Sequence, residues 1–143
     1  MTNRIEKSEA EWQGELSPSQ FKVLRKEGTE RAGTGPLNAE KRDGVFRCGG
    51  CHSELFSSEH KYESGSGWPS FYDVYAKDNV GTKKDRKLFM VRTEVHCDVC
   101  GGHLGHVFED GPQPTGLRYC LNSAALEFQP EGSDEVVPGA PDA

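Results

Sequence analysis

Two C-x-x-C motifs, Cys48–Cys51 and Cys97–Cys100, constrain the fold more than any other feature of the sequence. Two intervening residues let both sulfurs of a pair point at one centre, and four thiolates give the closed tetrahedral coordination of a structural Zn²⁺ site. The pairs lie about 45 residues apart, whereas a compact zinc ribbon has roughly 15–20. We therefore expect one structural Zn²⁺ per chain that joins two distant hairpins, with no organic cofactor, and with the ligands Cys48, Cys51, Cys97 and Cys100.

Two other uses of these cysteines are a redox-active dithiol and an iron–sulfur cluster. A thioredoxin-like dithiol needs a βαβ context, which the sequence lacks, and one active pair would not need a second. Structural zinc is the interpretation that the paired spacing favours most strongly.

The 143 residues include 17 Gly and 8 Pro, which is too many for a helical bundle, and the length fits one domain. Ser8 and Ser17 predict caps of two short helices, at about 9–14 and about 18–27, with Gly28 as a left-handed C-cap. Beyond residue 43, short apolar runs between Gly, Pro, Ser and Asp predict a mainly β fold of short antiparallel strands. The strands are expected at 44–47, 70–74, 87–96, 106–108, 117–122 and 126–128, with a surface loop at 77–87 and a frayed tail at 131–143.

The net charge of −6, without a basic stripe, argues against a partner that is nucleic acid or an anionic membrane. No run approaches the roughly 18 apolar residues of a membrane span, and the first residues lack the apolar region of a secretory signal. We expect a cytoplasmic protein, in which a reducing environment disfavours structural disulfides.

The fifth cysteine, Cys120, is left over once four are assigned to zinc. On a strand at 117–122, side-chain alternation places Arg118, Cys120 and Asn122 on one face. A guanidinium two residues away is expected to lower the pKa of the thiol from about 8.5 and so favour the nucleophilic thiolate. The alternative is an inert cysteine packed as a small hydrophobe, which is the commoner fate of a lone Cys.

Two further clusters complete the set of candidate residues. His103 and His106 flank a glycine and lead into a short strand on which His106 and Asp110 share a face, so Asp110 could orient His106. Histidine is the usual general acid near neutral pH. Trp68 follows two glycines and precedes a proline, which would hold its indole rigidly at the wall of an apolar pocket. Each of these residues, taken singly, is more often an ordinary core or surface residue.

Several of these motifs, taken together, resemble the signature blocks of the methionine-R-sulfoxide reductases of the B type. The resemblance covers about residues 8–128 and includes a helix block at 16–24. Its most specific parts are Gly-Ser-Gly-Trp-Pro-Ser-Phe at 65–71, Gly-Gly-His-Leu-Gly-His-Val-Phe at 101–108, Asp-Gly-Pro at 110–112 and Arg-Tyr-Cys-Leu-Asn-Ser at 118–123.

The resemblance implies one catalytic domain over 1–143, built as a β-tent or small barrel of antiparallel sheets with short N-terminal helices. It implies a monomer that repairs oxidised proteins by reduction of methionine-R-sulfoxide, free or protein-bound. Cys120 would attack the sulfoxide sulfur and become a sulfenic acid. His103, His106 and Asp110 would bind and protonate the oxygen, and Arg118 and Asn122 would poise the thiolate. Trp68 and Phe71 would contact the substrate.

The sequence departs from many members of this family at Ser66, where they carry a resolving cysteine. With four cysteines on zinc, no thiol remains to form a disulfide with Cys120. We therefore expect a one-cysteine cycle, in which thioredoxin or a small thiol reduces the sulfenic acid directly.

Two non-enzymatic hypotheses compete with this one. Other β-tent domains share paired zinc knuckles and bind modified residues or small ligands in aromatic cages, and a zinc-ribbon scaffold would serve only protein contacts. A binding cage needs aromatic residues but no activated thiol, so Arg118 beside Cys120 favours the enzyme.

Overall fold

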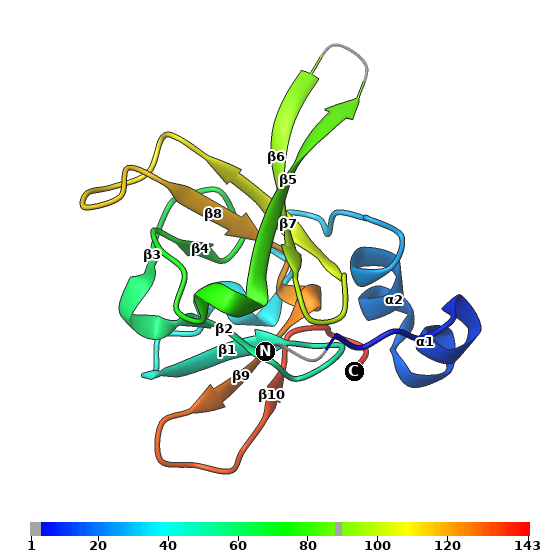
Figure 1. Cartoon of the computed structure of the whole chain (residues 1–143). Coiled ribbons are helices and arrows are strands. Elements are labelled where there is room, and N and C mark those ends of the chain that lie inside the picture. Colours follow the sequence, from blue (N-terminus) through cyan, green and yellow to red (C-terminus); the bar gives the residue numbers. More distant parts are fainter. Residues whose placement is uncertain (1–3, 88–89) are drawn as a thin grey trace.

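Two antiparallel sheets dominate the computed structural model of the chain, which describes residues 4–87 and 90–143 (Figure 1). The first sheet has the strand order β10-β9-β1-β2, and the second has the order β3-β4-β8-β7-β6-β5. The helices α1 (Glu9–Glu15) and α2 (Pro18–Leu24) lie together on one side of the sheets. The strands are β1 (Gly44–Cys48), β2 (Glu54–Ser57), β3 (Lys61–Tyr62), β4 (Ser70–Phe71), β5 (Val80–Lys87), β6 (Met90–Cys97), β7 (His103–Phe108), β8 (Arg118–Leu121), β9 (Leu126–Pro130) and β10 (Val137–Pro138). The mainly β fold is confirmed, although the sheets do not close into a barrel.

Both helices begin as predicted, because Ser8 and Ser17 accept the backbone N–H three residues on and form capping boxes. The end of α2 differs from the prediction. The helix stops at Leu24, and the residue in the left-handed region is Glu27, with φ of 55°, whereas Gly28 is not among the positive-φ residues. Gly28 instead permits a close approach, since its N–H donates to the Lys22 carbonyl at 2.8 Å and a Cβ would lie 2.9 Å from that oxygen.

Two segments expected to lack regular structure form strands. The charged segment 77–87, predicted as a loop, contains β5, which pairs along its length with β6 and projects from the body with it (Figure 1). β5 is the edge strand of its sheet, where charged side chains are common because they face water and discourage pairing with other chains. The expected frayed tail instead carries β10, which pairs with β9, and Ala140 is buried.

The core lies where the two sheets meet. Phe46 of the first sheet contacts Phe71 of the second edge-on, at 5.0 Å between ring centroids, and Phe56 of the first sheet stacks on Phe71 at 4.8 Å. Offset and edge-on contacts are the favourable geometries for aromatic pairs. Trp12 is also buried and attaches α1 to this core.

Among the helices of the described residues, none combines the length and the apolar character needed to cross a bilayer.

Candidate functional site

The four cysteines of the paired motifs converge at one point between the two sheets. Cys48 ends β1 of the first sheet and Cys97 ends β6 of the second. Their Sγ atoms lie 3.7 Å from Cys100 and 3.6 Å from Cys51, respectively, close to the roughly 3.8 Å edge of a tetrahedron whose Zn–S bonds are about 2.3 Å. All four sulfurs lie within 4.8 Å of one another. The cluster is thus a zinc-binding site that joins the sheets, as predicted from the spacing.

Glycines let the chain turn tightly around this metal site. The Gly50 N–H points at the Cys48 sulfur, with a distance of 3.4 Å between nitrogen and Sγ. α2 covers the cluster, because a Cβ at Gly50 or Gly102 would meet the Leu24 side chain. Four protein ligands leave no position for a substrate, so zinc here is structural.

A separate cavity of about 340 Å³ surrounds Cys120 on the second sheet. Cys120 lies in β8, directly opposite Ser70 of β4 and His106 of β7. Residues directly opposite in an antiparallel pair project from the same face, so β4 and β7 flank the thiol with a hydroxyl and an imidazole. The cavity is lined by Thr29, Ser66, Trp68, Arg92, Gly105, His106, Phe108, Arg118, Cys120, Leu121 and Asn122.

The pKa of the Cys120 thiol is raised, whereas the charge of Arg118 had led us to expect a lowered pKa. Burial is the largest cause, because it penalises the charged thiolate. The Ser66 hydroxyl and the Arg118 guanidinium both lower the pKa, but together they do not offset burial. The thiol is therefore the resting form near neutral pH, and the thiolate forms at the moment of reaction or at higher pH.

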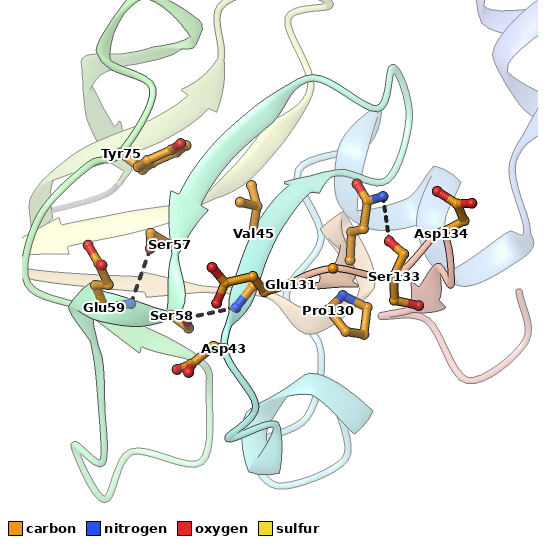
Figure 2. A pocket seen from close by; sticks show the side chains of 13 residues that line it. Asp43, Val45, Ser57, Ser58, Glu59, Tyr75, Pro130, Glu131, Ser133 and Asp134 are labelled. Carbon is orange, nitrogen blue, oxygen red and sulfur yellow. Dashed lines mark hydrogen bonds between the residues drawn. The ribbon is translucent and has the colours of Figure 1, made fainter.

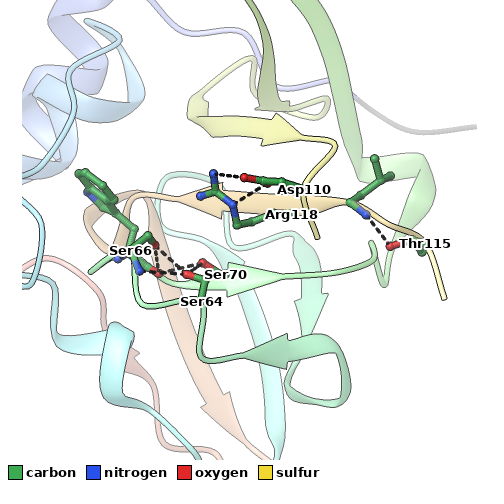
Figure 3. Close-up of polar contacts among 8 residues, drawn as sticks. Ser64, Ser66, Ser70, Asp110, Thr115 and Arg118 are labelled. Atoms are coloured by element: carbon green, nitrogen blue, oxygen red, sulfur yellow. Dashed lines mark hydrogen bonds and ion pairs between the residues drawn. The ribbon is translucent and has the colours of Figure 1, made fainter. Parts of the chain in front are cut away.

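The strongest contact of the Arg118 guanidinium is with the carboxylate of Asp110. Figure 3 shows its guanidinium paired with Asp110, with Nε to Oδ1 at 2.9 Å and NH2 to Oδ2 at 3.2 Å. The prediction that Asp110 contacts His106 was wrong. The Asp110 side chain is 66% exposed and points to the guanidinium of Arg118. Arg118 also lies over the Phe108 ring, 4.5 Å from its centroid. Asp110 thus orients Arg118 at the pocket rim.

The carboxylate that contacts His106 is Asp85 of β5, at 3.0 Å between Nε2 and Oδ2. Asp85 is also 3.4 Å from Arg92 of β6, a pocket residue. A carboxylate can only accept, so His106 donates its Nε2–H and presents Nδ1 elsewhere. Asp85 was not among the candidate residues, because it lies in the charged segment that was predicted to be a loop.

His103 lies behind His106 and does not line the cavity. It is buried at 4% exposure, its Nδ1 lies 3.1 Å from Oε2 of Glu94, and the two imidazoles meet edge-on with centroids 5.5 Å apart. Glu94 is also buried, and burial raises the pKa of its carboxyl. The structure thus separates the two histidines into one that faces the cavity and one that supports it.

Of the two aromatic residues predicted at the substrate site, only Trp68 is there. Trp68 lines the cavity, and its indole N–H donates to the Glu30 carbonyl at 3.0 Å. Phe71 is fully buried in the core, because side-chain alternation turns it away from the face that carries Ser70. Phe108 of β7 occupies the cavity wall instead.

A serine network fixes the loop before Trp68. The Ser64 hydroxyl lies 2.8 Å from that of Ser66 and 2.7 Å from that of Ser70 (Figure 3). The Trp68 N–H donates to the Ser66 hydroxyl at 3.3 Å. Ser66 also lines the cavity with Cys120, so residue 66 presents a hydroxyl and not a thiol to the Cys120 cavity.

A second cavity, of about 550 Å³, lies over the first sheet and near the 131–134 turn (Figure 2). Its wall includes Tyr75, Val45 and the acidic residues Asp43, Glu59 and Glu131. No Cys, His or Lys is among the described residues that line this cavity, whereas Cys120 and His106 line the cavity of the second sheet.

Comparisons with known proteins agree with this geometry. The sequence pattern of the SelR domain family matches residues 16–130. The chain is 56% identical over 129 residues to the peptide methionine sulfoxide reductase MsrB of Methanosarcina mazei, covering 90% of this chain and 92% of that protein. It is 53% identical to the protein of the same name from Leptospira interrogans, covering 92% and 100%.

A solved structure shares the fold at low sequence identity. The C-terminal domain of Caenorhabditis elegans Dicer-related helicase 3, solved with a 5′-triphosphorylated RNA, has a TM-score of 0.54 and is 17% identical. The match covers 69% of this chain and 61% of that one. This similarity concerns the fold alone.

Proposed function

Since this chain belongs to the SelR domain family of methionine-R-sulfoxide reductases, we propose that the Cys120 cavity is its active site. The chain reduces the R epimer of methionine sulfoxide to methionine through a cysteine thiol. The observation that carries the assignment is that Cys120 and His106 lie directly opposite each other and line one cavity with Trp68.

Cys120 is the nucleophile in this proposal. Its sulfur attacks the sulfoxide sulfur while the thiol proton passes through His106 to the sulfoxide oxygen. The S–S bond of this adduct then breaks as the hydroxyl moves from the methionine sulfur to the Cys120 sulfur, so methionine leaves with two more electrons on its sulfur and Cys120 becomes a sulfenic acid. The sum is one thiol and one sulfoxide giving one sulfenic acid and one thioether, with no net proton.

The remaining residues hold this pair and the substrate in place. Asp85 stabilises the imidazolium of His106, and His103 supports His106 from behind. Arg118 provides a hydrogen bond at the reacting sulfur, and Asn122 lines the cavity beside it. Trp68 and Phe108 form an apolar wall suited to the methyl group of the substrate.

Replacement of Asp85 by asparagine tests the role of this carboxylate. We expect Asp85→Asn to lower the rate of the first turnover about 10-fold, because an amide neither fixes the Nε2–H form of His106 nor stabilises its imidazolium. Stopped-flow measurement of a single turnover gives this rate. The matched control is Asp78→Asn, which makes the same change at an exposed site outside the cavity, and equal rates in the two variants would contradict the role of Asp85.

We also propose that an external thiol, such as that of thioredoxin or a small molecule, reduces Cys120 directly. Two such thiols convert the sulfenic acid to a thiol, with release of one disulfide and one water. Ser66 supports this cycle, because an internal disulfide with Cys120 would need a thiol at position 66, and serine carries a hydroxyl there.

Mass spectrometry of the oxidised protein tests the one-cysteine cycle. After one turnover without reductant, we expect a trapped sulfenic acid at Cys120 and no internal disulfide to it. Ser66→Cys is the positive control, and this variant should form a disulfide between position 66 and Cys120, because residue 66 already lies against the thiol. A disulfide between Cys120 and a zinc ligand in the unaltered protein would refute the proposal.

A further inference from the structure

The strap at residues 28–35, between α2 and a 3₁₀ turn at Pro36–Ala39, crosses the edge of the cavity. Thr29 lines the cavity. The Gly33 N–H donates to the Gly67 carbonyl at 2.7 Å, which ties the strap to the loop that precedes Trp68. The position of the strap therefore bears on the shape of the active site.

One strap residue, Glu30, is bonded through its main chain to two walls of the cavity. Its N–H donates to Oδ1 of Asn122 at 2.9 Å, and its carbonyl accepts the indole N–H of Trp68 at 3.0 Å. The Asn122 amide also donates to the Leu104 carbonyl at 3.1 Å, so its orientation is fixed from both sides. A shift of Glu30 would therefore move or release Trp68 and Asn122 together.

The side chain of Glu30 anchors this arrangement. Oε1 accepts the backbone N–H of Ala124 at 2.8 Å, at the start of the 3₁₀ turn Ser123–Ala125 that follows Asn122. Gly35 packs closely against the Glu30 carboxylate and Ser123, since a Cβ at position 35 would clash with both. The carboxylate is thus held by backbone donors, in a partly buried position.

The charge of Glu30 also reaches the nucleophile. Burial raises the pKa of the Glu30 carboxyl, and the N–H groups of Ala124 and Ser123 lower it. Burial is also the largest cause of the raised pKa of Cys120, and the Glu30 carboxylate adds a smaller effect in the same direction. The other charged or titratable groups around Cys120 are Arg118, Arg92, His106 and Tyr62. Lys22 of α2 and Arg31 share a cavity of about 220 Å³ with Glu30.

We propose that Glu30 is a positioning residue for the reductase: its main chain holds Trp68 and Asn122, and its side chain anchors the strap to the turn that follows Asn122. The proposal rests on the assignment of the Cys120 cavity as the active site. It predicts two separable effects, one on geometry that needs the anchoring side chain and one on ionisation that needs the negative charge.

Two variants separate these effects. Glu30→Gln keeps an oxygen to accept the Ala124 N–H but removes the charge, so we expect the alkylation profile of Cys120 to shift to lower pH and kcat/KM to stay within about threefold of the original. Glu30→Ala removes the anchor as well, so we expect kcat/KM to fall about 10- to 100-fold, because small misplacements of contact residues are costly. In Glu30→Ala, KM for free methionine-R-sulfoxide should rise as Trp68 loosens.

The measurements are the pH profile of Cys120 alkylation by iodoacetamide in the zinc-loaded protein and the steady-state kinetics of each variant. Glu131→Gln, an exposed site outside the Cys120 cavity, makes the same charge change and should leave both readouts unmoved. A Glu30→Gln alkylation profile that coincides with the original would overturn the ionisation role. Unchanged kcat/KM in a folded Glu30→Ala would overturn the positioning role.

The alkylation profile keeps this inference distinct from the proposed function. If the unaltered protein reduced no sulfoxide, the active-site assignment would fail, yet the profile of Glu30→Gln would still report whether Glu30 acts on Cys120. If Glu30→Ala does not fold, Glu30→Gln still gives both readouts.

Discussion

Cys120→Ser is expected to abolish the reduction of methionine-R-sulfoxide, with a fall in rate of about 10⁴-fold or more, as seen when an enzyme loses its nucleophile. A serine hydroxyl occupies nearly the same volume but is a far weaker nucleophile at neutral pH. The assay is a single turnover with free methionine-R-sulfoxide, followed by release of methionine.

The control for Cys120→Ser is the fold of the variant itself. Cys120 lies outside the zinc cluster, so the variant should keep one zinc per chain and the circular dichroism of the original. Activity that survives in such a folded variant would mean that the nucleophile is elsewhere.

Removal of the zinc should have the largest effect on stability. Structural zinc sites in small peptides bind with about 10–16 kcal/mol, which matches the whole free energy of unfolding of a typical domain. Here the metal joins β1 of one sheet to β6 of the other, so Cys97→Ser should abolish cooperative unfolding. Thermal denaturation with metal analysis measures this, and Cys120→Ser serves as the matched cysteine control.

A well-folded protein without metal would contradict the structural role of the cluster. Zinc loss that lowered activity but left the unfolding transition unchanged would do the same. We expect one zinc per chain and loss of activity only as a consequence of unfolding.

Local signals in the sequence sufficed for the helix starts and the metal site. Ser8 and Ser17 cap the backbone within three residues, and the spacing within each C-x-x-C motif defines the metal site without any knowledge of the fold. The end of α2 was harder, because Glu27 takes the left-handed conformation that a glycine was expected to take. The conformation of residues 27 and 28 depends on how the turn after α2 packs on Lys22.

The neighbours of Cys120 could be predicted where they share its strand, but not where they come from distant strands. Alternation along β8 placed Arg118 and Cys120 on one face, and both line the cavity in the structure. The contact of Asp85 with His106 could not be predicted from the sequence, because Asp85 lies in the edge strand β5, two strands away from β7 in the sheet. Such contacts depend on strand order, for which short strands rich in charge give no signal.

The position of Phe71 and the pKa of Cys120 show a second limit of prediction from the sequence. Alternation separates Phe71 from Ser70, but which face of β4 enters the core and how deeply the Cys120 thiol is buried both depend on how the two sheets pack. The charge of Arg118 acts in the predicted direction, but desolvation is the larger effect.

The most direct test of the central claim is a dithiothreitol-driven assay with the separate R and S epimers of methionine sulfoxide. We predict turnover of the R epimer by the zinc-loaded protein and none of the S epimer above the rate of Cys120→Ser. Turnover of the S epimer alone, or no turnover of either, would contradict the assignment.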